Sequence, residues 1–122
     1  MINIRGISAF FNTDLGSKLR RCQNVLREFK FSVLEDADVN DPSLTGEKVL
    51  LQGVVDCAMI EDDGIIIIDF KTDRVDRQTV TQVVENYRPQ VETYASAMEK
   101  IYELSVKEKY LYFFHLGKLV KL

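Results

Sequence analysis

The chain has 122 residues, of which 46% are hydrophobic and 29% are charged, as expected for a single globular domain with a modest core. The net charge of −3 argues against a protein that binds nucleic acid by charge alone, because such binding depends on neutralising phosphates. Two distant cysteines, Cys22 and Cys57, exclude a four-cysteine iron–sulfur cluster in this chain and indicate a reducing, cytoplasmic setting, and no apolar run is long enough to span a membrane.

Hydrophobic periodicity predicts the order helix, three strands, helix, two strands. In chain order the predicted elements are helical segments within 8–22, a strand over 25–33, a loop over 35–47, strands over 49–60 and 65–70, a helix over 78–103, and strands over 109–114 and 119–122. Such an order is typical of an α/β domain with a mixed central sheet and helices on both faces. Thr13 or Asp14 is expected to cap the first helix. The long helix is expected to break at Tyr87-Arg88-Pro89, because the residue before a proline avoids the helical region.

The second and third predicted strands are expected to form a hairpin with Asp62-Asp63 at its tip. This register puts Asp56 directly opposite Asp69. Side chains alternate along a strand, so Lys71 falls on the same face as the two carboxylates. A three-residue loop with a bulge would instead shift the pairing by one residue and separate Asp56 from Asp69.

Two facing carboxylates among apolar neighbours need a compensating charge. Asp56 and Asp69 are hard oxygen ligands of the kind that Mg²⁺ uses together with phosphate oxygens, and Lys71 can neutralise charge in phosphoryl chemistry. The alternative is an ion pair of Asp69 with Lys71 on a solvated sheet face, which the unbroken apolar run 65–68 disfavours. The residues therefore indicate a metal-and-phosphate site and leave its substrate open.

Three segments, in this order, resemble the PD-(D/E)XK nuclease superfamily. Gly53-Val-Val-Asp56, Asp69-Phe-Lys71 and Gln90-Val-Glu-Thr-Tyr94 match the GxxD, DxK and QxxxY motifs of its RecB-like nuclease domains. The flanking segments 10–19, 27–32 and 110–122 resemble the C-terminal nuclease domain of the AddA family, the helicase–nuclease subunits of bacterial AddAB. The resemblance covers nearly the whole chain. It implies a restriction-endonuclease-like core and a single nuclease domain over 1–122 that is a C-terminal piece of a longer helicase–nuclease.

The resemblance also implies a role for each residue of the DxK triplet and for Asp56. Asp56 and Asp69 would bind Mg²⁺ or Mn²⁺, with the backbone carbonyl of Phe70 as a further ligand. Lys71 would orient or activate the attacking water and steady the phosphate charge. The implied activity is that of a metal-dependent DNA nuclease.

On the next predicted helix, Gln90 and Tyr94 lie one turn apart and would line the site and contact the DNA strand. The implied reaction is exonucleolytic hydrolysis of DNA phosphodiesters within an ATP-dependent helicase–nuclease that acts in double-strand break repair and recombination. The implied partners are DNA, the helicase portion of the parent chain and an AddB-type subunit.

One metal ligand of the family has no counterpart in this chain. RecB-like nucleases carry a further histidine on an upstream helix, in AddA within a Gly-Thr-x-x-His stretch, and this stretch is missing here. The only histidine, His115, is expected in the core or in a turn, and Glu28 on the neighbouring strand is a second-tier candidate at the site. Two other functions therefore stay open: a catalytically silent module that binds DNA or a partner protein, and a stand-alone nuclease.

Other aromatic and charged residues have ordinary structural interpretations. The aromatic residues between Tyr102 and Phe114 are expected in the core and not as a base-stacking surface. Asp73 and Arg74 predict a surface ion pair or a phosphate contact.

Overall fold

The computed structural model describes residues 9–36 and 42–122. Its elements are the helix α2 (Asp14–Arg21), the strand β1 (Val25–Asp36), the short 3₁₀ helix η2 (Pro42–Leu44), the strands β2 (Lys48–Glu61) and β3 (Gly64–Lys71), the helix α3 (Val80–Tyr102), and the strands β4 (Val106–Phe113) and β5 (Lys118–Lys121). The predicted order of helix, three strands, helix and two strands is confirmed. None of the described helices is both long and apolar enough to cross a membrane.

The five strands form one mixed sheet in the order β1-β2-β3-β4-β5. Neighbouring strands are antiparallel except β3 and β4, which are parallel and are joined by α3 as a crossover. β3 therefore lies at the centre of the sheet, with β2 on one side and β4 on the other. The expected α/β fold with a mixed sheet is confirmed.

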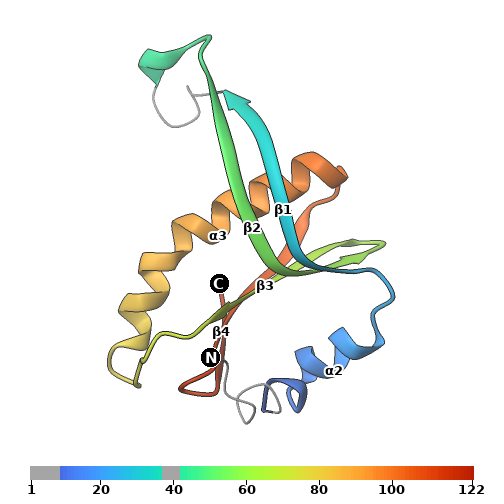
Figure 1. Ribbon diagram of the computed structural model, residues 1–122, viewed down its shortest axis with the longest axis vertical. Coiled ribbons are helices and arrows are strands. Elements are labelled where there is room, and N and C mark those ends of the chain that lie inside the picture. Colours follow the sequence, from blue (N-terminus) through green and yellow to red (C-terminus); the bar gives the residue numbers. More distant parts are fainter. Residues whose placement is uncertain (1–8, 37–41) are drawn as a thin grey trace.

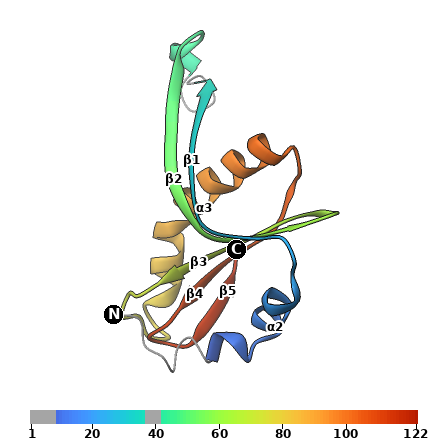
Figure 2. The ribbon, with the colours of Figure 1, turned by 45° about the vertical axis from the view of Figure 1, so that its right-hand side comes forward.

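Helices cover both faces of the sheet, as predicted, with α2 on one side and α3 on the other (Figures 1 and 2). Leu15 and Leu19 of α2 pack on Ile66 and Ile68 of β3, together with Phe10. On the other face, buried residues of α3 pack on the intervening isoleucines: Ala95, Ala97 and Met98 share a cluster with Ile65 and Ile67. All four isoleucines are fully buried, which explains why this strand lacks the polar alternation of a half-exposed one.

The β1–β2 ribbon is longer than its sequence predicted and projects beyond the rest of the sheet (Figure 2). β1 continues to Asp36 instead of ending at Val33, so the predicted loop over 35–47 is wrong at its start, and its residues 37–41 lie outside the described part of the chain. Antiparallel pairing of residues 34–36 with 48–50 satisfies the backbone of this polar stretch and overrides its weak strand propensity.

The other strand boundaries differ from the prediction by one to three residues. β4 begins at Val106, before the predicted Lys109, because the parallel pairing of Glu108 with Ile66 holds a polar segment in the sheet. The first helical region is also confirmed, with residues 9–11 and α2 helical and Ser8 outside the described residues. Thr13 is its cap, since the Thr13 hydroxyl accepts the Gly16 N–H at 3.0 Å.

The predicted break in the long helix is wrong, because α3 runs through Pro89 as one continuous helix (Figure 1). Proline removes one backbone donor, which leaves the Glu85 carbonyl without its helical partner. Pro89 and Glu85 both lie on the exposed side of α3, where water can take over that carbonyl. The predicted apolar face of α3 is confirmed for its buried members, but Ile101 is 40% exposed.

Candidate metal centre and active site

Asp56 and Asp69 approach each other across the β2–β3 hairpin, whose predicted register is confirmed. Ile60 pairs with Ile65, and the ladder runs as far as Cys57 with Ile68. The next pair would be Asp56 with Asp69, but here a side chain replaces the backbone ladder: the Phe70 N–H donates to Asp56 Oδ2 at 2.9 Å. The bulge that would have put the two carboxylates out of phase is absent from this described hairpin.

Asp69 is only 4% exposed, which contradicts the alternative of an ion pair on a solvated sheet face. Lys71 Nζ lies 2.7 Å from Asp69 Oδ2. The angles of this contact fall outside hydrogen-bond geometry, so this buried oxygen has no hydrogen-bond donor among the residues that the structure describes. A desolvated acceptor oxygen beside a second carboxylate is the environment in which a cation is most strongly favoured.

The surroundings of Asp69 favour its protonated form in the absence of a cation. Burial raises the pKa of Asp69 to about 7, and the neighbouring Asp56 carboxylate adds to the increase, while Lys71 opposes it. A carboxyl group that keeps its proton to near neutral pH is typical of a functional site and unusual for a structural ion pair.

Gln90 on α3 reaches the site and holds the lysine of the DxK triplet. The Lys71 ammonium donates to Gln90 Oε1 at 3.0 Å. Tyr94, one turn further along α3, packs edge-on against Phe31 with ring centroids 5.6 Å apart. Burial raises the pKa of Tyr94, and the nearby charges of Asp69 and Asp56 raise it further. Both predicted helix residues therefore lie beside the carboxylates, but only Gln90 contacts Lys71.

The glycine of the GxxD segment has a packing reason. Gly53 pairs with Phe31 on β1, and a Cβ at residue 53 would lie 2.7 Å from Tyr94 Cε1 and 2.9 Å from Phe31 Cζ. Only a residue without a side chain lets both rings close over β2. Gly53 thereby sets the position of Tyr94 and, through α3, of Gln90.

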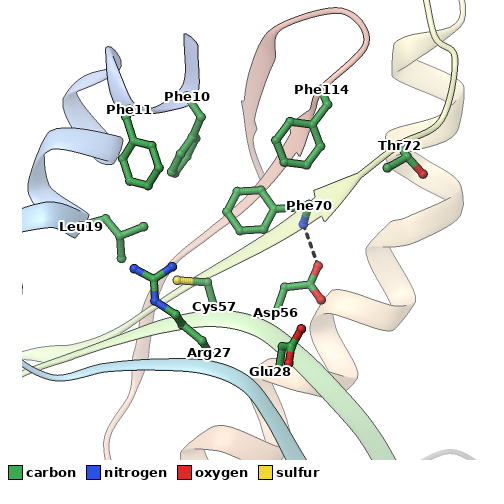
Figure 3. Close-up of a pocket in the computed structure, with 10 residues that line it drawn as sticks. All are labelled: Phe10, Phe11, Leu19, Arg27, Glu28, Asp56, Cys57, Phe70, Thr72 and Phe114. Carbon is green, nitrogen blue, oxygen red and sulfur yellow. Dashed lines mark hydrogen bonds between the residues drawn. The ribbon is translucent and has the colours of Figure 1, made fainter. Parts of the chain in front are cut away.

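A pocket of about 590 Å³ opens beside Asp56 (Figure 3). One wall is aromatic, with Phe70 and Phe114 stacked at 5.4 Å, and the other carries Glu28 next to Asp56. Glu28 has a positive φ of 49°, a conformation that non-glycine residues rarely adopt. The strand pairing passes from Arg27 to Phe29 across this residue, which aims Glu28 into the pocket, away from the side occupied by Phe29 as predicted.

The carboxylates fit a divalent cation of the Mg²⁺ type. Within residues 9–36 and 42–122, no three His, Cys, Asp or Glu side chains gather into one cluster, so Glu28 does not join Asp56 and Asp69 as a third close ligand. Mg²⁺ keeps several waters and is commonly held by one or two carboxylates plus substrate phosphates. The buried, donor-free oxygen of Asp69 meets that requirement.

His115 is exposed in the turn between β4 and β5, as the turn interpretation predicted. The predicted ion pair of Asp73 with Arg74 is replaced by another contact, since Asp73 accepts hydrogen bonds from the Tyr87 hydroxyl. Sequence analysis placed Tyr87 at a helix break and missed its contact with Lys71. The signal was its spacing of three residues from Gln90, which puts both side chains on one face of a helix.

Comparison with known proteins identifies the family. The model of the PD-(D/E)XK nuclease superfamily matches residues 8–120. The chain belongs to this superfamily. Its restriction-endonuclease-like core and its motif order agree with the fold described above.

Individual members of the PD-(D/E)XK superfamily resemble the chain along almost its whole length. An ATP-dependent helicase/nuclease protein of the AddA type from Carboxydothermus hydrogenoformans is 39% identical over 99% of this chain, and one from Bacillus cereus (strain Q1) is 38% identical over 99%. The corresponding protein of Thermoanaerobacter sp. (strain X514) is 36% identical over 98%. The chain spans only about a tenth of the length of these relatives.

The raised pKa of Asp69 predicts that this nuclease-family domain loses stability as pH rises in a chelating buffer. An unfolded aspartate loses its proton near pH 3.8, whereas folded Asp69 keeps it to about pH 7. Between these values the folded state binds more protons, so the free energy of unfolding falls by up to about 1.4 kcal/mol per pH unit. Urea denaturation from pH 4.5 to 8 measures the slope. Asp69→Asn should flatten it and the exposed control Asp62→Asn should preserve it; equal slopes in all three would contradict the prediction.

The close approach at Gly53 predicts that Gly53→Ala destabilises the fold by about 1–3 kcal/mol through overpacking. Removing the ring in the background Tyr94→Ala should reduce that cost, because one of the two obstructing rings is gone. A double-mutant cycle read by urea denaturation measures the coupling. Strictly additive costs would show that Gly53 does not position Tyr94.

The positive φ of Glu28 predicts that Glu28→Gly stabilises the chain by about 1 kcal/mol, since glycine adopts this conformation without strain. The matched control is Lys30→Gly, an exposed position two residues along the same strand, which should destabilise by about 0.5–1 kcal/mol. Destabilisation of similar size at both positions would disprove strain at Glu28.

Proposed function

We propose that the chain is a Mg²⁺-dependent DNA nuclease domain that hydrolyses phosphodiesters as an exonuclease. The observation that carries this proposal is the buried Asp69 carboxylate beside Asp56, with the Lys71 ammonium 2.7 Å from Asp69. Membership of a nuclease superfamily supports DNA as the substrate.

In the proposed reaction, water adds across a phosphodiester bond. A water oxygen bonds to phosphorus, the bond from phosphorus to a sugar oxygen breaks, and that oxygen takes up a proton. A divalent ion, when bound, supplies a more acidic water and a positive charge for the phosphate oxygens. Asp56 and Asp69 would hold the ion, with the Phe70 carbonyl as the further ligand.

Lys71 would act on the phosphate and on the attacking water. Its ammonium carries a fixed positive charge next to the carboxylate pair, where it can orient a water and offset negative charge on the phosphate. Gln90 restrains that ammonium at 3.0 Å, and Tyr94 would face the DNA strand from the same helix. The role of Gln90 is therefore to orient the lysine as well as to line the site.

Glu28 is the proposed auxiliary group. It shares a pocket with Asp56 but does not complete a three-residue cluster with the other carboxylates among the described residues. A water-mediated contact to the ion is consistent with that distance, since Mg²⁺ retains waters. Glu28→Gln should therefore weaken metal binding less than substitution of Asp56 or Asp69.

The similarity to helicase/nuclease proteins supports a place for the domain in a larger enzyme. We propose that it supplies the nuclease of an ATP-dependent helicase–nuclease that processes double-strand breaks in the cytoplasm. DNA, the helicase portion of that chain and an AddB-type subunit are the proposed partners.

Calorimetric titration with Mg²⁺ and Mn²⁺, followed by cleavage of single-stranded DNA, tests the function. Wild type and the hairpin-tip control Asp62→Asn should bind metal, whereas Asp56→Asn and Asp69→Asn should not. Lys71→Gln should still bind metal but cleave about 10²–10³-fold more slowly.

The outcomes of this titration separate the competing functions. Metal binding without cleavage would favour a silent binding module that retains its site. Equal binding by wild type and Asp69→Asn would exclude the carboxylate pair as the metal centre. Efficient cleavage by a dimer of this chain alone would favour a stand-alone nuclease.

A further inference from the structure

The Lys71 ammonium is enclosed from three directions, and its side chain is only 13% exposed. Asp69 Oδ2 lies at 2.7 Å and Gln90 Oε1 at 3.0 Å. The third neighbour is the face of the Tyr87 ring, whose centroid is 3.9 Å from Lys71 Nζ. This distance is well within the range of a cation–π contact, and partial burial strengthens such contacts.

The Tyr87 ring is itself fixed by a carboxylate. Its hydroxyl donates to Asp73, with both carboxylate oxygens at 3.0 Å. Burial raises the pKa of Tyr87, and its hydrogen bond to Asp73 raises it further, so the hydroxyl remains a donor. Asp73 follows Lys71 by two residues in the segment that leaves β3, so α3 is linked to this segment directly at the lysine.

These contacts solve a conflict at Asp69. Under the proposed function Asp69 binds the metal ion, so a lysine held by Asp69 alone would share its anchor with that ion. Tyr87 and Gln90 hold the ammonium from α3 without using a carboxylate. The ring attracts the ammonium as a whole charge and therefore does not depend on one directed hydrogen bond.

We propose that Tyr87, locked in place by Asp73, is a positioning residue that holds the Lys71 ammonium at the carboxylate pair. The proposal rests on the nuclease function for its kinetic consequence, but its geometric content stands on the contacts of Lys71 alone. A flexible lysine side chain carries about 2 kcal/mol of rotamer entropy. Restricting it in advance lowers the cost of placing its charge on a phosphate.

The position of the ring can be read by NMR without any activity. A proton above an aromatic ring is shielded, so the Lys71 methylene next to Nζ should resonate upfield of the other lysines in the metal-free chain. Tyr87→Leu should abolish that displacement, and Tyr87→Phe should retain part of it. Asp73→Ala should reduce it with the ring still present. An undisplaced Lys71 signal in the wild type would overturn the proposal.

The kinetic consequence is measured with single-stranded DNA and Mg²⁺. Tyr87→Leu should lower kcat about three- to thirty-fold, the range of one cation–π contact, and change KM less than about twofold. Tyr87→Phe should recover most of kcat because it keeps the ring. An unchanged kcat in Tyr87→Leu would overturn the positioning role.

A matched control separates positioning from stability. Tyr102→Leu removes another partly buried tyrosine of α3, one that packs on Phe29 with ring centroids 6.0 Å apart. It should cost similar stability but leave kcat and the Lys71 signal unchanged. If the chain cleaves no DNA, the nuclease function fails while the NMR comparison still decides the contact of Tyr87 with Lys71.

Discussion

The charge of the Asp69 carboxylate is buried at the centre of the sheet, and the rest of the site is arranged around that one constraint. An unpaired carboxylate in an apolar interior is costly, and a proton, a neighbouring cation or a metal can relieve the cost. Here Lys71 offsets part of the charge and a raised pKa offsets more, while Asp56 works against both. A fold optimised for stability alone would not keep two carboxylates so close.

Three elements with different roles meet at this carboxylate. The hairpin of β2 and β3 fixes Asp56 against the Phe70 backbone, so one carboxylate is oriented by a peptide N–H. The crossover helix α3 then supplies the groups that touch Lys71, a glutamine oxygen and an aromatic ring. The strands therefore determine where the negative charges lie, and the helix determines where the positive charge lies.

Local patterns were enough to predict the parts of this site that depend on one hairpin and one helix. The hairpin register and the burial of the four isoleucines follow from strand alternation and turn chemistry. Gln90 was found through its place in a motif. The resemblance to a nuclease family, now confirmed by the match over residues 8–120, supplied what periodicity could not.

The features that sequence missed all depend on contacts between distant segments or on solvent. Pro89 was expected to end a helix, but its lost hydrogen bond lies on the exposed side of α3, where water replaces it. The positive φ of Glu28 is imposed by the bend of a long ribbon and has no signature in a glutamate. The contact of Tyr87 with Lys71 joins a helix to a strand end, and no periodicity encodes such a pair.

The parallel pairing of β3 with β4 ties the chemistry to the completion of folding. Asp69 pairs with Leu111 across a connection that includes all of α3, a non-local contact with a high entropic cost of closure. Before β4 docks, β3 is an edge strand and Asp69 faces water on that side. A newly made or partly unfolded chain therefore lacks the desolvated carboxylate. The site forms only with the complete sheet, which couples reactivity to structural integrity and leaves misfolded copies inert.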